Sequence, residues 1–292
     1  MTALRALLEG IVDYAGLFPP AALDMPSAVR NYASYRSDPA SWMLGRFVLP
    51  VARFDEFSTA RASVESGTEP WRVSALLGSA LASDVERVRT FNQSARGKAV
   101  IDSLEAKLTT PAEIEAVAKA VGREIELFAE LPLDADLTPL VAAVKRGGIK
   151  AKMRTGGIVA SAVPPAESIV RFMRACLDAG VAFKATAGLH HPLRAVYRLT
   201  YDASGPTGLM FGYLNVFLAA AFLAHGMSDA DAARLLDERD ASAFTFDDEG
   251  ISWNGFTVNA AHVREVREHV AVAFGSCSFR EPVDELRLVT SV

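Results

Sequence analysis

The sequence predicts an α/β protein of the (β/α)8-barrel class, also called a TIM barrel. Short apolar runs alternate with amphipathic helical segments along the chain, which is typical of parallel βα units. The 292 residues are enough for eight such units. No glycine-rich dinucleotide fingerprint follows an early strand, which disfavours the main alternative, an open doubly wound sheet. We therefore expect one barrel domain over residues 1–292.

Eight apolar runs are the candidate barrel strands. In chain order they are residues 10–17, 46–51, 72–78, 99–108, 124–131, 149–154, 181–187 and 243–247. The helical patterns between and after them cover residues 26–35, 54–66, 83–94, 111–121, 137–145, 165–179, 208–224 and 260–274.

Some of these helices carry clear end signals. Thr110 supplies a hydroxyl cap, and Pro111 and Glu113 suit a first turn. Glycines at 122, 147 and 180 follow or end helical patterns, as expected for helix C-termini. An extra short helix at 229–239 and a small hairpin-like insertion at 246–255, with turns at Glu249-Gly250 and Asn254-Gly255, are expected near the eighth strand.

The segment 208–226 is almost free of charge and approaches the length of a membrane span. Because Asn215 lies inside it and the rest of the chain is well patterned, we interpret it as a buried helix.

Composition excludes some classes of function. The net charge of −5 argues against general nucleic-acid binding, which needs an excess of Lys and Arg. Cys176 and Cys277 lie far apart with no metal-ligand spacing, so a reducing cytoplasm is the default location. We expect a small-molecule substrate, no membrane or nucleic-acid partner, and leave a homo-oligomer open.

Two cationic runs mark the candidate active site. Lys150, Lys152 and Arg154 alternate along one strand and therefore share a face. The next strand carries Lys184, followed by Thr186, Gly188 and the pair at 190–191. Both runs lie among small or apolar neighbours and end in glycine, which favours strand ends at a cavity over an exposed edge strand protected by lysines.

Catalytic residues of barrels lie at the C-terminal ends of the strands and on the loops that follow. This rule selects as candidate catalytic residues Asp13, Glu105, Glu130, Lys152, Lys184, His190 and His191, with Asp247 and Asp248 from the eighth strand. It selects as candidate substrate-binding residues Tyr14, Lys107, Arg154, Thr155, Gly156, Gly157 and Thr186.

Charged faces on three successive strands are unusual, because barrel interiors are normally apolar. A lysine beside other cations loses its proton more easily and can attack a carbonyl group. For Glu126 and Lys150, low on their strands, we expect mutually neutralising structural pairs instead. For Lys152 and Lys184 we expect a functional role.

The run at 154–157 combines guanidinium donors with accessible backbone N–H groups, which suits a carboxylate or phosphate. His190 and His191 could supply a general acid or base, or a metal ligand together with strand-end carboxylates. No His-Glu-x-x-His spacing is present. We therefore expect an enzyme without a cofactor and keep a divalent metal ion as the alternative. Cys277 lies in a small-residue turn with no histidine at a recognisable position before it, so the sequence does not favour a nucleophilic cysteine.

Residues 152–157 (Lys-Met-Arg-Thr-Gly-Gly) and 183–188 (Phe-Lys-Ala-Thr-Ala-Gly) resemble two runs of class I aldolases of the deoxyribose-phosphate aldolase type. That family carries a Schiff-base lysine on strand six and a second lysine on strand seven, and Asp102 falls where it has a strand-four aspartate. The resemblance covers about a quarter of the chain. The family's glycine-rich phosphate loop after strand eight is missing here, which implies that the substrate is not a sugar phosphate. The whole chain also resembles a bacterial barrel family, but that resemblance specifies no activity.

The resemblance implies lyase or aldol chemistry on a small carbonyl compound that bears a carboxylate. Lys152 would form the Schiff base, Lys184 would depress its pKa, Arg154 would hold the anion, and a histidine would move the proton. The alternatives are a metal-dependent lyase, isomerase or hydrolase, and a non-catalytic barrel that binds a small molecule.

Overall fold

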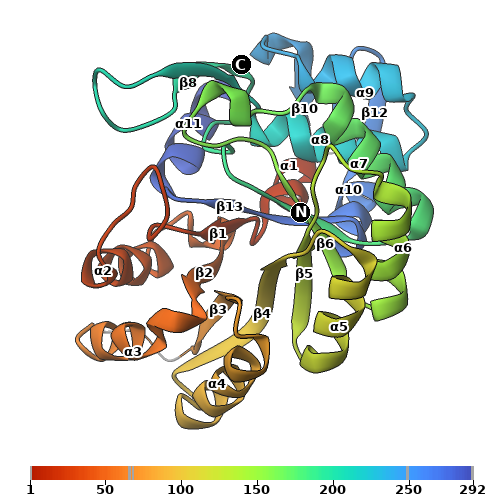
Figure 1. Cartoon of the computed structure of the whole chain (residues 1–292). Coiled ribbons are helices and arrows are strands. Elements are labelled where there is room, and N and C mark those ends of the chain that lie inside the picture. Colours follow the sequence, from red (N-terminus) through yellow and green to blue (C-terminus); the bar gives the residue numbers. More distant parts are fainter. Residues whose placement is uncertain (1, 65–66, 68, 248–249, 291–292) are drawn as a thin grey trace.

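The chain folds into a closed barrel of eight parallel strands, as the sequence predicts (Figure 1). A computed structural model describes residues 2–64, 67, 69–247 and 250–290. Around the barrel the strand order is β1-β13-β7-β6-β5-β4-β3-β2. The barrel strands are β1 (Val12–Tyr14), β2 (Leu44–Pro50), β3 (Trp71–Leu76), β4 (Ala99–Lys107), β5 (Glu126–Glu130), β6 (Lys150–Arg154), β7 (Phe183–Thr186) and β13 (Ala271–Ser276).

The helices follow the strands and cover the outside of the barrel, as α4, α5 and α6 do in Figure 1. In chain order they are α1 (Ala3–Leu8), α2 (Met25–Arg36), α3 (Phe54–Ala62), α4 (Leu81–Ser94), α5 (Pro111–Val121), α6 (Leu137–Gly147), α7 (Ala166–Ala179), α8 (Tyr213–Ala224), α9 (Asp229–Leu236), α10 (Ala260–His269) and α11 (Arg280–Thr290). Short 3-10 turns are η1 (Ser41–Met43), η2 (Val51–Arg53), η3 (Ala160–Ala162) and η4 (Ala241–Ala243).

Helix ends follow the chemistry of the sequence. At α5 the Thr110 side chain accepts from the Glu113 N–H and the Glu113 carboxylate accepts from the Thr110 N–H, forming a complete capping box. Gly122 and Gly180 follow their helices with positive φ, which glycine adopts without a steric penalty.

Helix α8 is buried along almost its whole length, as expected for segment 208–226, although the first residues of that segment form a strand. The Asn215 side chain accepts from the Arg194 N–H and donates to the carbonyls of Leu235 and Glu238, so its polar atoms are satisfied inside the core. None of the helices in the described part of the chain is long and apolar enough to cross a membrane.

The eighth barrel strand is β13, and the prediction of an eighth strand at 243–247 was wrong. Residues 244–246 form β10 (Phe244–Phe246), the first strand of a separate antiparallel sheet in which β11 (Gly250–Trp253) pairs with both β10 and β12 (Phe256–Asn259). Helix α10 ends at His269, and the rest of the segment expected to be helical becomes β13. A short, fully buried strand is a continuous apolar run, which periodicity cannot distinguish from a buried helix.

This antiparallel sheet contains the predicted hairpin turn. Asn254 and Gly255 both have positive φ between β11 and β12, as a two-residue hairpin requires. Asp247 accepts a hydrogen bond from the Gly250 N–H within the same sheet, so it is not at the end of a barrel strand. Asp248 and the expected turn residue Glu249 lie outside the described residues.

A second insertion follows β7. It is the two-stranded hairpin of β8 (Ala195–Arg198) and β9 (Thr207–Met210), which projects at the upper left of Figure 1. The sequence did not indicate this hairpin, whose strands are only four residues long.

Candidate active site

A chain of buried ion pairs crosses the C-terminal half of the barrel interior. Nζ of Lys152 on β6 lies 2.6 Å from Oε2 of Glu105 on β4 and 2.8 Å from Oε2 of Glu130 on β5. Register explains the convergence, because Lys152 pairs with Glu130 across β5 and β6, and with Lys184 across β6 and β7. Side chains paired on neighbouring parallel strands point to the same face of the sheet.

Lys184 continues this chain toward β1. Its Nζ lies 2.8 Å from Oε1 of Glu105 and also donates to Oδ2 of Asp13. Ser74 donates to Oε1 of Glu105 at 2.7 Å, and the Arg46 N–H donates to Oδ1 of Asp13 at 2.8 Å. The carboxylates of Asp13 and Glu105 are thus held by several donors each, as buried charges require.

The network fixes the ionisation of its members. Burial alone would raise the pKa of Glu105, but the ammonium groups of Lys152 and Lys184 outweigh burial and hold the pKa well below its usual range. Burial would lower the pKa of Lys184, but Asp13 and Glu105 outweigh it and raise the pKa. Glu105 is therefore a carboxylate and Lys184 an ammonium at neutral pH.

A separate charged layer lies toward the N-terminal ends of the strands. Lys150 is paired with Glu126, which also accepts from Arg46 at 2.9 Å, as expected for structural pairs. Asp102 belongs to this layer, 2.6 Å from Arg46. The register of β3 and β4 shifts there, from Val73 opposite Ile101 to Ser74 opposite Ser103. Asp102 is therefore the extra residue of a β-bulge and lies opposite no residue of β3. Glu105, not Asp102, is therefore the strand-four acid beside the two lysines.

A cavity of about 400 Å³ opens above this network at the C-terminal ends of the strands. Its ionisable side chains are those of Glu105, Lys152, Arg154, His190 and Cys277, and most of the remaining wall is apolar. Its lining residues are Ala15, Phe18, Pro19, Pro20, Val48, Leu76, Glu105, Lys152, Arg154, Gly156, Gly157, Ile158, Val159, Ala162, Thr186, Ala187, Gly188, His190, Leu199, Met210, Gly275 and Cys277.

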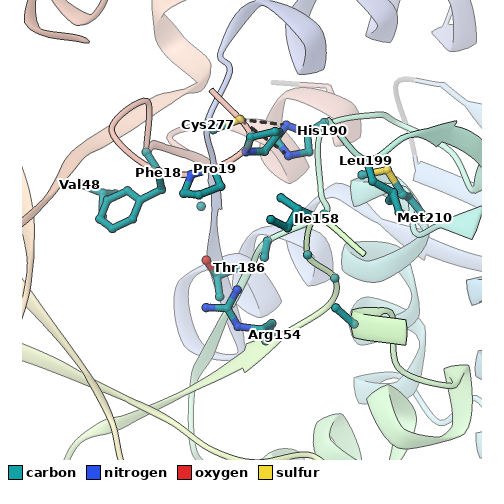
Figure 2. A pocket seen from close by; sticks show the side chains of 18 of the residues that line it. Phe18, Pro19, Val48, Arg154, Ile158, Thr186, His190, Leu199, Met210 and Cys277 are labelled. Carbon is teal, nitrogen blue, oxygen red and sulfur yellow. Dashed lines mark hydrogen bonds between the residues drawn. The ribbon is translucent and has the colours of Figure 1, made fainter. Parts of the chain in front are cut away.

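The cavity has two polar ends (Figure 2). Arg154 and Thr186 lie at one end of the view, and His190 and Cys277 lie at the other. Phe18 and Pro19 on one side, and Ile158, Leu199 and Met210 on the other, line the space between them. Leu199 and Met210 come from the β8–β9 region, which therefore helps to enclose the site.

Two glycines bring the loops after β6 and β7 together. A Cβ on Gly188 would lie 3.0 Å from Cα of Gly156, and a Cβ on Gly156 would lie 3.1 Å from Cα of Gly188. Thr155 reinforces the contact, because its hydroxyl donates to the Ala187 carbonyl at 2.6 Å. Gly188 also has a φ of +76°. Only a residue without a side chain fits at this approach without strain.

Several predicted site residues lie outside the lining. Asp13, Glu130 and Lys184 belong to the ion-pair network beneath or beside the cavity. Thr155 is turned toward the loop contact, and Lys107 is exposed at the end of β4. Glu105, Lys152, Arg154, Gly156, Gly157, Thr186 and His190 all line the cavity.

Tyr14 and His191 have partners elsewhere. The Tyr14 hydroxyl accepts from Asn31 at 3.3 Å inside an aromatic cluster, where burial raises its pKa. His191 lies 2.8 Å from Glu285 and stacks on Tyr197 with ring centroids 3.5 Å apart. Burial lowers the pKa of His191, despite the carboxylate of Glu285.

Cys277 lines the cavity, although the sequence did not favour it as a site residue. It follows β13 directly, and its Sγ lies 3.8 Å from Nδ1 and 3.9 Å from Nε2 of His190. Correct assignment of residues 271–276 as the eighth strand would have placed Cys277 at a strand end, the position from which barrels draw catalytic residues.

Among the described residues, no three His, Cys, Asp or Glu side chains form a group that could hold a metal ion. No known family model matches the chain, and no curated protein matches it either.

Proposed function

We propose that the protein is a lyase that forms an imine between Lys152 and a small carbonyl compound bearing a carboxylate. The observation that carries this proposal is that Lys152 borders the cavity while its Nζ contacts two carboxylates, those of Glu105 and Glu130. The (β/α)8 barrel is commonly enzymatic, and this position is at the catalytic end of the barrel.

The surroundings of Lys152 match the charge of an imine intermediate. Lys152 passes a proton to Glu130 or to water, and its free amine then adds to the substrate carbonyl. The same proton then returns to the hydroxyl group of the carbinolamine, which leaves as water, and the protonated imine that remains carries the positive charge that the ammonium carried before. Glu105 and Glu130 already stabilise a cation at that point, so the site needs little reorganisation.

Lys184 supports this arrangement from below. It remains an ammonium between Asp13 and Glu105 and balances their charge. Glu105 therefore stays ionised next to Lys152, and Lys184 itself has no access to the cavity lining.

The rest of the cavity indicates the class of substrate. The side chain of Arg154 is 53% exposed, and among the described residues its ionic partner is Glu130 at 3.4 Å, so its guanidinium can take a substrate carboxylate. The apolar walls formed by Phe18, Ile158, Leu199 and Met210 favour an uncharged, apolar remainder. We therefore expect 2-oxo acids with an apolar chain to bind better than phosphorylated compounds.

Reductive trapping tests the proposal. The purified full chain is incubated with sodium cyanoborohydride and pyruvate, 2-oxobutyrate or 2-oxohexanoate, and the modified peptide is identified by mass spectrometry. We expect a secondary amine at Lys152, with exposed Lys107 and buried Lys184 unmodified under the same conditions. Trapping that is absent, or that is equal at Lys107 and Lys152, would rule out the proposal.

A further inference from the structure

A second group of reactive side chains faces the same cavity, at the end opposite Arg154 (Figure 2). Cys277 after β13 and His190 in the segment after β7 line the cavity, and Glu281 in the first turn of α11 contacts His190 from outside the lining. Cys277 and Glu281 are four residues apart, but His190 lies 87 residues before Cys277, and the closed barrel brings it beside them.

The geometry is that of a thiol, an imidazole and an orienting carboxylate. Sγ of Cys277 lies beside the imidazole of His190, 3.8 Å from Nδ1 and 3.9 Å from Nε2, and Oε2 of Glu281 lies 3.3 Å from Nδ1. Ser276 also contacts Nδ1, at 3.2 Å. His190 is 6% exposed and Cys277 is 5% exposed, yet both line the cavity. Both side chains are thus almost fully buried and border the cavity.

Glu281 is itself positioned by a second partner. The Tyr201 hydroxyl donates to Oε2 of Glu281 at 3.0 Å and lies 3.7 Å from Sγ of Cys277. Burial would raise the pKa of Glu281, but His190 and Tyr201 outweigh it and lower the pKa. A carboxylate that orients an imidazole beside a nucleophile is the recurring arrangement for activating a thiol or hydroxyl.

The surrounding charges favour a cationic His190. Burial disfavours the imidazolium, but the contacts with Cys277 and Glu281 outweigh burial and raise the pKa of His190 to about 10. The titratable and charged groups that face the pair from the neighbouring elements are Tyr14 on β1, His191 in the same segment, Tyr201 after β8, and Glu281 and Glu285 on α11.

We propose that Cys277 and His190 form a thiolate–imidazolium pair, oriented by Glu281, and that this pair exchanges the substrate proton during carbon–carbon bond cleavage. The second part rests on the proposed imine at Lys152. The first part does not depend on it.

The proton balance of the cleavage is complete with these groups. The thiolate takes the proton of the substrate hydroxyl on the β-carbon, and the oxygen electrons form the carbonyl group of the departing aldehyde. The bond between the α- and β-carbons breaks, and its electrons convert the protonated imine to a neutral enamine. The thiol then returns the proton to the enamine carbon, and water hydrolyses the resulting imine to release the 2-oxo acid.

Alkylation kinetics test the pair without any substrate. Iodoacetamide reacts with thiolates, and an ordinary cysteine with a pKa of about 8.5 is ionised to only about one part in 300 at pH 6. We expect alkylation of Cys277 at pH 6 to be at least about 30-fold faster in the wild type than in His190→Gln. At pH 9.5 the two rates should agree within about threefold, which controls for access to the buried sulfur.

Two further variants complete this test. Glu281→Gln should move the alkylation profile toward alkaline pH, and Glu281→Asp should restore part of the wild-type profile, which a merely structural role would not do. Cys176 on α7 is the internal reference, because burial raises its pKa and it should stay unlabelled. A wild-type to His190→Gln ratio that is the same at pH 6 and pH 9.5 would overturn the pair.

Exchange of the α-hydrogens of 2-oxobutyrate in D2O, followed by NMR, tests the proton transfer. Cys277→Ser should keep cyanoborohydride trapping at Lys152 but slow this exchange by about 100-fold or more. Exchange at the wild-type rate in Cys277→Ser would overturn the catalytic role. Failure of trapping in the wild type would instead rule out the imine proposal and, with it, the role of the pair in cleavage. The alkylation result would still show whether Cys277 and His190 form a thiolate–imidazolium pair.

Discussion

Oε2 of Glu105 accepts a hydrogen bond from Nζ of Lys152 at 2.6 Å, and both side chains are only 5% exposed. The other oxygen of the same carboxylate accepts from Lys184 at 2.8 Å. Glu105 is therefore the anion shared by two buried ammonium groups. Without Glu105, each lysine would keep one carboxylate in place of two, Glu130 for Lys152 and Asp13 for Lys184, and the loss of counter-charge is costly in a buried medium of low polarity.

The first prediction concerns the substitution Glu105→Gln. We expect it to lower the free energy of unfolding by about 3–5 kcal/mol, because Lys152 and Lys184 lose their common counter-charge. Glu126→Gln is the matched control, since Glu126 also pairs with a lysine but its side chain is 37% exposed. Its cost should be about 1 kcal/mol or less. Urea denaturation measures both, and equal losses would contradict the importance given to burial.

The second prediction is a pH dependence of stability. The folded pKa of Glu105 is lowered, so its contribution is present above about pH 4.5 and is lost as the pH falls toward the folded value. The folded pKa of Lys184 is raised, so its contribution is present below about pH 10.5 and is lost as the pH rises through the folded value. The contributions of these two residues should both be fully present between these limits.

Thermal melting across pH checks this dependence. The fall in stability below pH 4.5 should be smaller in Glu105→Gln, because glutamine has no proton to take up. An acid limb of unchanged slope in that variant would show that other carboxyl groups dominate acid unfolding.

The sequence predicted much of this network, because alternation along a strand is a local property. Lys152 and Arg154 share parity on their strand, and Glu126 and Glu130 share parity on theirs, whatever the rest of the fold does. The alternation pattern does not predict the register between neighbouring strands. The shift that passes over Asp102 and brings Glu105 to Lys152 depends on how the closed barrel sets its register.

The residues at the opposite end of the cavity could not be predicted from local sequence pattern, for a different reason. Cys277 becomes a site residue only when residues 271–276 are known to form a barrel strand. That run follows α10 without a glycine or proline between them, so nothing in the sequence separates helix from strand. Cys277 then meets His190 across 87 residues of chain, a contact that only the closure of the barrel specifies.

The third prediction assigns the substrate anion to Arg154. Arg154→Gln should weaken binding of 2-oxobutyrate by about 10- to 100-fold, the effect of losing a charge-assisted hydrogen bond of about 1.5–3 kcal/mol. The concentration dependence of trapping at Lys152 measures this affinity. Lys107→Gln removes an equally positive but exposed side chain outside the cavity lining, and should change the affinity by less than about twofold. If both variants weaken binding equally, the attraction is a general effect of charge and not a contact with Arg154.

The last prediction tests whether glycine is needed at position 188 because two loops approach each other there, or only because of its backbone conformation. Gly188 and Gly97 both have a φ of +76°, but a Cβ on Gly97 would meet nothing within 4 Å, whereas a Cβ on Gly188 would lie 3.0 Å from Cα of Gly156. Gly97→Ala should therefore cost about 1–2 kcal/mol, the penalty of a left-handed alanine. Gly188→Ala should cost about 1–3 kcal/mol more, because the two loops must move apart. Since Gly156 and Gly188 both line the cavity, Gly188→Ala should also impair trapping at Lys152, while Gly97→Ala should leave it unchanged. Urea denaturation and the trapping assay measure these effects, and equal behaviour of the two variants would show that the contact between the loops does not shape the site.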